Sequence, residues 1–168
     1  MMSAESDQDF STPPLYVTVR VYGICLDNEN RILLSDERLG QLNVTKFPGG
    51  GLIPGEGILD CLHREWKEET GAGIASARHF YTTDFFIRSA FDPKAQVICA
   101  YYLLDANQPI HAPFSNQPDF FEAQPGKLRW HSLEHLTPEC FFFPSDQVVC
   151  RLLLKKLLPH RSFQEKNS

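Results

Sequence analysis

Carboxylate side chains are concentrated in one short stretch of the sequence, residues 50–72. Glu65, Glu68 and Glu69 follow one another at helical spacing, and Glu56 precedes them. Such like charges repel one another unless a cation or a proton joins them. Oxygen-rich clusters suit hard divalent ions such as Mg²⁺ and Mn²⁺ far better than zinc. The stretch therefore predicts a divalent-metal site, although an isolated E-x-x-E-E would more simply be a solvated helix face paired with basic neighbours.

The element that must position these carboxylates is a helix. Residues 57–70 contain no proline and, after the first position, no glycine, and Gly71 follows as a helix stop. At about 100° per residue, the three clustered glutamates fall on one arc, and Leu59, Leu62 and Trp66 fall on the neighbouring arc. We therefore expect an acidic stripe beside a stripe that packs into the core.

A glycine turn precedes this helix. Residues 47–51 read FPGGG, and Pro54 and Gly55 form a second turn signal. Glycines allow backbone carbonyls to approach a metal and backbone amides to approach a phosphate. We expect a carbonyl oxygen of Gly49 or Gly50 to join the metal site.

Together, the fixed residues of the stretch follow the pattern G-x5-E-x7-R-E-U-x-E-E-x-G-U, where U is apolar. This pattern resembles the Nudix box, without a gap or an insertion. The resemblance implies the α/β Nudix fold, with a mixed β-sheet in an α/β/α sandwich, over nearly all of residues 15–158. It also implies hydrolysis of a nucleoside diphosphate linked to another moiety, with Mg²⁺ as the cofactor and Mn²⁺ able to substitute.

The resemblance also implies roles for individual residues. Glu65 is the favoured general base, with Glu56 able to assist, and Arg64 orients the carboxylates through charge-assisted hydrogen bonds. Family members place the base differently, so that assignment stays open. The implied metal ligands are Gly49, Gly50, Glu65, Glu68, Glu69 and Glu122.

Residues 122–126 (EAQPG), followed by a strand-like run with Trp130, sharpen the resemblance. They are similar to the MutT type of Nudix enzyme, which removes oxidised nucleoside triphosphates and in which the glutamate of this segment binds metal. In related enzymes an Asn or Asp at the position of Asp146 reads the purine edge. An N-cap role for Ser145 or Asp146, in a helix running to about residue 158, is an equally weighted alternative.

Two other functions stay open at this point. The same fold could act on a nucleotide sugar, ADP-ribose or a dinucleotide. A Nudix-like regulator could bind a nucleotide without catalysis, although the intact box, the short chain and the net charge of -5 disfavour that class.

Two further side chains are candidates for substrate binding. Arg38 could meet a phosphate, as could Lys46, although either alone is more simply a solvated loop charge. Phe85, or alternatively Phe91, could line a pocket for the base. Residues 106–121 carry three prolines and are expected to form a loop over the substrate opening.

The remaining sequence predicts the scaffold. Residues 15–25 read as a strand with residues 31–34 as its hairpin partner, and residues 77–89 and 96–104 read as a second hairpin. We expect one domain over residues 14–160, between a mobile N-terminal tail (1–13) and a C-terminal tail (161–168).

Composition limits the partners. The 168 residues carry a net charge of -5 and a pI near 5.6, which argues against a nucleic-acid-coating or membrane-binding surface. A small nucleotide is the expected partner, and a homodimer is possible. No basic segment precedes an apolar run at the N-terminus and no apolar stretch is long enough to cross a bilayer, so a cytoplasmic location is expected. The five cysteines are widely spaced, which predicts reduced thiols.

Overall fold

The computed structural model describes residues 12–120 and 126–158. The expected tails fall largely outside these residues and stay predictions. Among the described residues, no helix is long and apolar enough to cross a membrane. In chain order the elements are β1 (Tyr16–Cys25), β2 (Arg31–Leu39), β3 (Leu42–Lys46), β4 (Gly49–Gly51), α1 (Ile58–Thr70), β5 (Ile74–Thr82), β6 (Ala95–Ala106), β7 (Lys127–Ser132), the short 3-10 helix η1 (Pro138–Cys140) and α2 (Pro144–Leu157).

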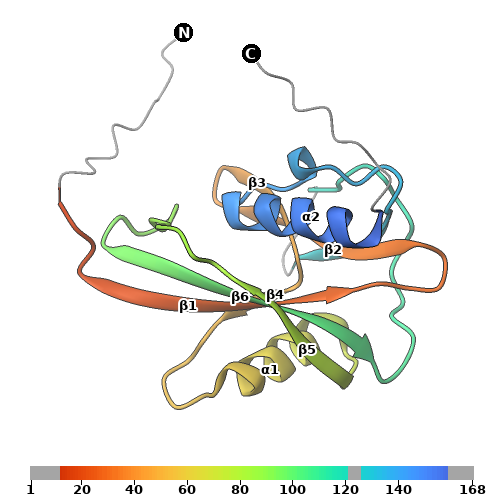
Figure 1. Cartoon of the computed structure of the whole chain (residues 1–168), viewed down its shortest axis with the longest axis horizontal. Helices are drawn as coiled ribbons and strands as arrows, with labels where there is room; N and C mark the ends of the chain where they lie inside the picture. Colours follow the sequence, from red (N-terminus) through yellow and green to blue (C-terminus); the bar gives the residue numbers. More distant parts are fainter. Residues whose placement is uncertain (1–11, 121–125, 159–168) are drawn as a thin grey trace, which may run out of the picture.

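The strands form two sheets. The larger sheet has the order β4-β1-β6-β5, and β1 runs parallel to β6 but antiparallel to β4, so this sheet is mixed. The smaller sheet has the order β3-β2-β7 and is antiparallel throughout. Helices α1 and α2 lie on opposite sides of the larger sheet (Figure 1). The expected mixed sheet between helices is therefore confirmed.

The expected hairpin between residues 15–25 and 31–34 is wrong in its pairing. The chain does reverse there, and the Asp27 N–H donates to the Arg31 carbonyl, but a single bridge between Leu26 and Ile32 is all that follows. Strand β2 then diverges and becomes the centre of the smaller sheet, because its run of buried side chains needs cover on both faces. A turn signal predicts where the chain reverses, but not which strands exchange hydrogen bonds afterwards.

The antiparallel pairing of the second expected hairpin is confirmed, but the bounds of both strands differ from those expected. Strands β5 and β6 pair antiparallel, but β5 ends at Thr82. Residues 83–94 form a long connection, in which Arg88 makes one isolated bridge to Gln96.

Helix α1 is held against the larger sheet by Trp66, which is 1% exposed. It packs in a cluster with Val21, Leu62 and Leu104. Gly23 leaves space for this ring and for Leu104, because a Cβ at that position would lie 3.2 Å from the Trp66 Cε3 atom and 2.4 Å from the Leu104 Cδ2 atom. Burying a large apolar side chain contributes on the order of 2 kcal/mol, so this contact fixes α1, and with it the glutamates, relative to β1.

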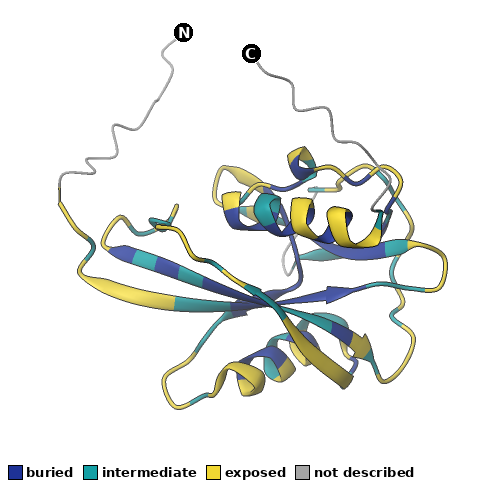
Figure 2. Cartoon of the chain, in the orientation of Figure 1, coloured by how far each residue is buried: buried dark blue, intermediate teal, exposed yellow. Residues whose placement is uncertain are grey.

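Helix α2 covers the other face of the sheet. Its buried Val149, Leu153 and Leu154 pack with Tyr22 and Ile24, whose side chains point away from α1 because neighbouring residues of a strand face opposite sides. Figure 2 shows the buried residues gathered along the sheet and on the helix faces that contact it. The larger sheet, which contains the glycine turn strand β4, is therefore packed on one face by α1 and on the other by α2.

The ends of α1 lie where the sequence predicts them. Gly57 is the N-cap residue, and the Asp60 carboxylate accepts a hydrogen bond from its N–H at 2.9 Å. Gly71 ends the helix with φ 73°, a left-handed conformation that favours glycine. The expected N-cap of α2 at Ser145 or Asp146 is wrong, because the helix begins at Pro144 and its N-cap residue is Phe143. Proline suits the first helical position because it has no N–H to satisfy.

Candidate active site

The glycine turn and α1 meet at Gly50 and Glu65. A Cβ on Gly50 would lie 2.3 Å from the carboxyl carbon of Glu65, so only glycine leaves room for this carboxylate. Gly49 has φ 147°, and a Cβ there would lie 2.1 Å from the Val21 carbonyl oxygen. The spacing of Gly50 and Glu65 in the sequence thus has a steric reason. Glycine in β4 leaves the space that the carboxylate of Glu65, on α1, occupies.

Arg64 joins the acidic residues to the glycine turn. Its guanidinium donates two hydrogen bonds to the Glu56 carboxylate and one to the Gly51 carbonyl oxygen at 3.0 Å. It also donates to Glu65 Oε1 at 2.8 Å and lies 3.5 Å from Glu68 Oε2. Arg64 is therefore in position to orient the carboxylates, as its expected role requires.

Glu56 is held by this guanidinium. Hydrogen bonds from Arg64, helped by the backbone N–H of Ile53, lower the pKa of Glu56 to about 2. A carboxylate this acidic accepts a proton poorly near neutral pH, so the geometry suits an anchor for Arg64 better than a general base.

Glu69 lies at the inner edge of the acidic stripe. Burial raises the pKa of its carboxyl to about 7, against the opposing effect of the Lys46 ammonium. Its Oε2 atom is buried and has no hydrogen-bond partner, whereas Oε1 lies 3.4 Å from Lys46 Nζ. Glu68, by contrast, keeps 59% of its side chain exposed.

Lys46 is a buried residue at the end of β3, so the expected solvated loop charge is wrong, while its contact with a phosphate stays a prediction. Its side chain is only 2% exposed, and its ammonium donates to the Gly49 carbonyl oxygen at 2.9 Å. Glu37 Oε1 lies 2.9 Å from the same Nζ atom. Sequence reasoning missed Glu37 altogether. The sequence carries no local signal for this contact, because only the pairing of β2 with β3 brings Glu37 and Lys46 together.

The residues present fit a hard divalent ion. The donors gathered here are carboxylate and carbonyl oxygens, and the unpartnered Glu69 Oε2 is a buried acceptor that lacks a positive neighbour at hydrogen-bond distance. In the described part of the chain, however, no three His, Cys, Asp or Glu side chains are already grouped as a ligand set. Binding would thus require Glu68 and Glu69 to turn toward the ion. Glu122 lies outside the described residues and stays a predicted ligand.

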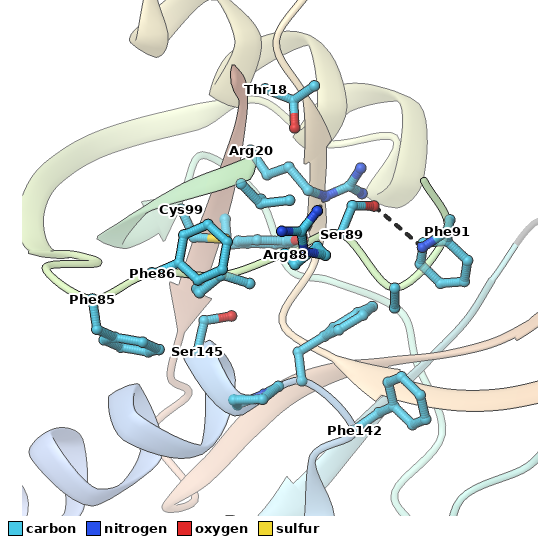
Figure 3. Close-up of a pocket in the computed structure, with 16 residues that line it drawn as sticks. Thr18, Arg20, Phe85, Phe86, Arg88, Ser89, Phe91, Cys99, Phe142 and Ser145 are labelled. Carbon is cyan, nitrogen blue, oxygen red and sulfur yellow. Dashed lines mark hydrogen bonds between the residues drawn. The ribbon is translucent and has the colours of Figure 1, made fainter. Parts of the chain in front are cut away.

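An aromatic cavity of about 380 Å³ lies on the α2 side of the sheet. Phe85, at 39% exposure, forms part of its wall, together with Arg20 and Arg88 (Figure 3). Strand β1 links the cavity to the glycine turn, because Arg20 pairs with Gly51. Its other aromatic lining residues are Tyr22, Phe86, Phe91, Phe142 and Phe143. The cavity therefore offers flat apolar surfaces, and one of its cationic groups lies on the strand that pairs with the glycine turn.

Asp146 lies behind this cavity. Its neighbour Ser145 lines the cavity, but the Asp146 carboxyl is fully buried, and its Oδ1 atom accepts a hydrogen bond from the Tyr101 hydroxyl at 2.6 Å. Burial raises the pKa of Asp146 to about 7, although the bond from Tyr101 opposes this. Its Oδ2 atom is buried without a partner. A base-reading role would require this oxygen to become accessible, and that role stays a prediction.

Two other expectations concern the rim of the site. Arg38 is exposed on β2, pairs with Asn43 in the β2–β3 hairpin and does not line the aromatic cavity, so its contact with a phosphate stays a prediction. Residues 106–120 run along β7, where the Trp130 indole N–H donates to the Ile110 carbonyl oxygen at 3.2 Å. None of residues 106–120 lines the aromatic cavity, and the expected position of this loop over the substrate opening stays a prediction.

Comparison with known proteins gives consistent matches. A model of the NUDIX domain matches residues 17–152. The putative 8-oxo-dGTP diphosphatase YtkD of Bacillus subtilis (strain 168) is 30% identical over 153 residues, which cover 90% of this chain and 85% of that protein. The mouse (Mus musculus) nucleoside diphosphate-linked moiety X motif 6 is 33% identical over 84% of this chain but only 44% of its own length. The chain spans 29% and 32% of two other relatives.

Among solved structures, a mutator MutT protein from Bacillus halodurans superimposes with a TM-score of 0.61 and 18% identity, over 82% of each chain. At this identity the likeness concerns the fold alone.

Proposed function

Because this chain belongs to the NUDIX domain family, we propose that it is a metal-dependent pyrophosphohydrolase that acts on a nucleoside triphosphate. The observation that carries this proposal is the grouping at the end of β4: Glu65 seated on Gly50, Arg64 bridging the carboxylates, and the unpartnered buried Oε2 of Glu69. Two relatives, one named an RNA pyrophosphohydrolase and one a putative 8-oxo-dGTP diphosphatase, support a pyrophosphohydrolase.

Each residue of the grouping has a chemical task. Mg²⁺, when bound, would neutralise the pyrophosphate oxygens and lower the pKa of a water molecule. Glu68 and Glu69 would hold the ion, with a carbonyl oxygen of the glycine turn. Glu65 would accept the proton of the attacking water on Oε2, because its Oε1 already accepts a hydrogen bond from Arg64. Glu56 would keep Arg64 in place.

The substrate class follows from the aromatic cavity. Phe85 and its aromatic neighbours would stack on a nucleobase, and Arg20 would attract the phosphates toward the glycine turn, with which it pairs. The 8-oxo-dGTP diphosphatase name of the Bacillus subtilis relative and the EAQPG segment both favour a triphosphate over a nucleotide sugar, ADP-ribose or a dinucleotide.

The test is a panel of nucleotides incubated with purified protein and Mg²⁺, scored for released phosphate and pyrophosphate. A nucleoside triphosphate should be the best substrate and should yield pyrophosphate. If ADP-ribose or a dinucleotide is hydrolysed best, that compound replaces the nucleoside triphosphate as the substrate class. If no nucleotide is hydrolysed, the result favours a regulator that binds a nucleotide without catalysis.

The metal assignment is tested with Glu69→Gln. Mutation of an outer-shell partner of a metal typically lowers metal affinity or activity about 10- to 100-fold. Loss of a direct ligand should therefore lower turnover at least about a hundredfold while leaving the fold intact. Glu29→Gln is the matched control, since its carboxylate is 71% exposed on the Asp27–Asn30 turn, and it should keep full activity. Unchanged turnover in Glu69→Gln, or full activity in excess chelator, would overturn the assignment.

A further inference from the structure

One cysteine differs from the other four in its surroundings. Cys25, Cys61, Cys99 and Cys150 are buried in the core. Cys140, at the end of η1, is only partly buried and lines a second cavity of about 640 Å³. This cavity lies between the smaller sheet and η1, and it is distinct from the aromatic cavity, although Phe142 borders both.

An imidazole is placed to accept the Cys140 proton. Cys140 Sγ lies 3.9 Å from Nε2 of His131. Nδ1 of His131 lies 2.8 Å from the Ser132 carbonyl oxygen. Because a carbonyl oxygen only accepts hydrogen bonds, Nδ1 must carry the proton, and Nε2 is then the nitrogen that can take one from the thiol. After that transfer both ring N–H groups keep acceptors, so the arrangement stabilises a thiolate–imidazolium pair.

Other charged and titratable groups face Cys140 from the elements packed around it. From β7, the Arg129 guanidinium lies on the cavity but is bound to Asp36 at 2.7 Å. The turn after β7 contributes His135, and η1 itself contributes Glu139. From α2, Cys150 is a neutral thiol near pH 7, because burial raises its pKa to about 12.

The contact with His131 also gives the Cys140 thiol a lower pKa than the remaining thiols have. The hydrogen bond with His131 lowers the pKa of Cys140 to about 7, although partial burial opposes it. Burial raises the pKa of each of Cys25, Cys61 and Cys99 to about 11. Near neutral pH, Cys140 is therefore the cysteine that carries substantial thiolate.

We propose that Cys140 is a modification site, at which His131 generates a thiolate that exchanges with low-molecular-weight disulfides entering this second cavity. The Cys140 proton passes to His131 Nε2, and Sγ then attacks one sulfur of the reagent disulfide. The S–S bond of the reagent breaks, a mixed disulfide forms on Cys140, and the second sulfur leaves as a thiolate that is protonated by the imidazolium or by water. The reagent disulfide is the oxidant, and excess thiol reverses the exchange.

The experiment uses 5,5'-dithiobis(2-nitrobenzoate), an aromatic disulfide, on the folded protein between pH 5 and pH 9. The release of the coloured thiol gives the rate, and mass spectrometry of peptides locates the modified cysteine. One fast thiol per chain should map to Cys140, and its rate should rise with a midpoint near pH 7. Cys140→Ser should lose the fast phase.

Removal of the imidazole tests the pairing itself. His131→Gln should move the midpoint up by more than one pH unit, toward the ordinary thiol value of about 8.5. At pH 6 the loss of thiolate, partly offset by its greater nucleophilicity, should slow the reaction about sixfold. His135→Gln is the matched control, because His135 lines the same cavity but offers only its backbone carbonyl to Sγ. This control should keep the wild-type profile.

Three results would overturn the proposal: a fast phase that maps to another cysteine, a wild-type midpoint near 8.5, or an unchanged midpoint in His131→Gln. Because His131 is buried in β7, circular dichroism of that variant accompanies the measurement. If the variant is unfolded, the wild-type profile and the mapped cysteine decide the question.

Discussion

Replacing Asp146 by Asn should change how the stability of the protein depends on pH. The carboxyl is fully buried, and one of its oxygens has no partner. Burial raises its pKa from 3.8 to about 7, so the folded state holds the proton more tightly than the unfolded state does. The stabilisation that this proton gives is fully present below about pH 4. It is lost progressively as pH rises to about 7, and above that the loss stays constant.

The size of this effect follows from the two pKa values. Between pH 5 and pH 8, wild type should lose about 2.6 kcal/mol of unfolding free energy through Asp146 alone. Asparagine does not ionise, so Asp146→Asn loses none of it. The advantage of the variant over wild type should therefore grow by about 2.6 kcal/mol over this interval. A constant cost, such as an amide N–H left without an acceptor, cancels because the same pair of proteins is compared at both pH values.

Urea unfolding of both proteins at pH 5, 6, 7 and 8 measures this difference directly. Asp105→Asn, which makes the same replacement at an exposed carboxylate, is measured alongside as the control. Parallel curves for wild type and Asp146→Asn would refute the reasoning, because they would mean that the buried carboxyl has the same pKa folded and unfolded. The same variant, run on the nucleotide panel, tests base reading: an unchanged ranking of substrates would remove Asp146 from the list of substrate-binding residues.

Two further predictions concern the acidic site. Gly50→Ala should displace the Glu65 carboxylate, lowering kcat/KM about tenfold or more and costing about 1 to 3 kcal/mol of stability, as overpacking does. Gly51→Ala, whose Cβ would meet its nearest neighbour at 3.8 Å, should be close to neutral, and equal effects of the two would contradict the steric argument. Because burial raises the pKa of Glu69 to about 7, Mn²⁺ affinity measured by paramagnetic resonance should increase from pH 6 to pH 7 and level off above that. Equal affinity at pH 6 and pH 8 would count against Glu69 as a ligand.

The sequence predicts best where the determinants are local. Residues 50–72 contain the determinants of the bounds of α1, of the contact between Gly50 and Glu65, and of the hydrogen bonds of Arg64. Spacing and helical period decide the geometry within this stretch. The aromatic residues around positions 85 and 91 indicate a pocket wall, and both Phe85 and Phe91 line the aromatic cavity, whereas contact of either ring with a base stays a prediction.

Other features depend on contacts between distant segments. The Lys46–Glu37 contact arises from strand pairing, and the burial of Asp146 depends on Tyr101, 45 positions away. No local pattern encodes either one. The divergence of β2 from β1 likewise follows from which faces the rest of the chain covers. The catalytic and metal-binding roles of the individual glutamates stay predictions until the variants are measured.

Lys46 has a consequence for the structure of the site when no metal ion is bound. Its ammonium reaches the Gly49 carbonyl oxygen and the carboxylates of Glu37 and Glu69, so a tethered counterion already compensates part of the charge that a metal would meet. Small zinc domains, by contrast, unfold when their ion is withdrawn. Here we expect the fold to be stable without a metal ion. A metal ion that binds would replace the Lys46 ammonium as the cation next to the Glu69 carboxylate. Binding and release of the metal ion would then exchange one cation for another locally, and neither would require the protein to fold or unfold.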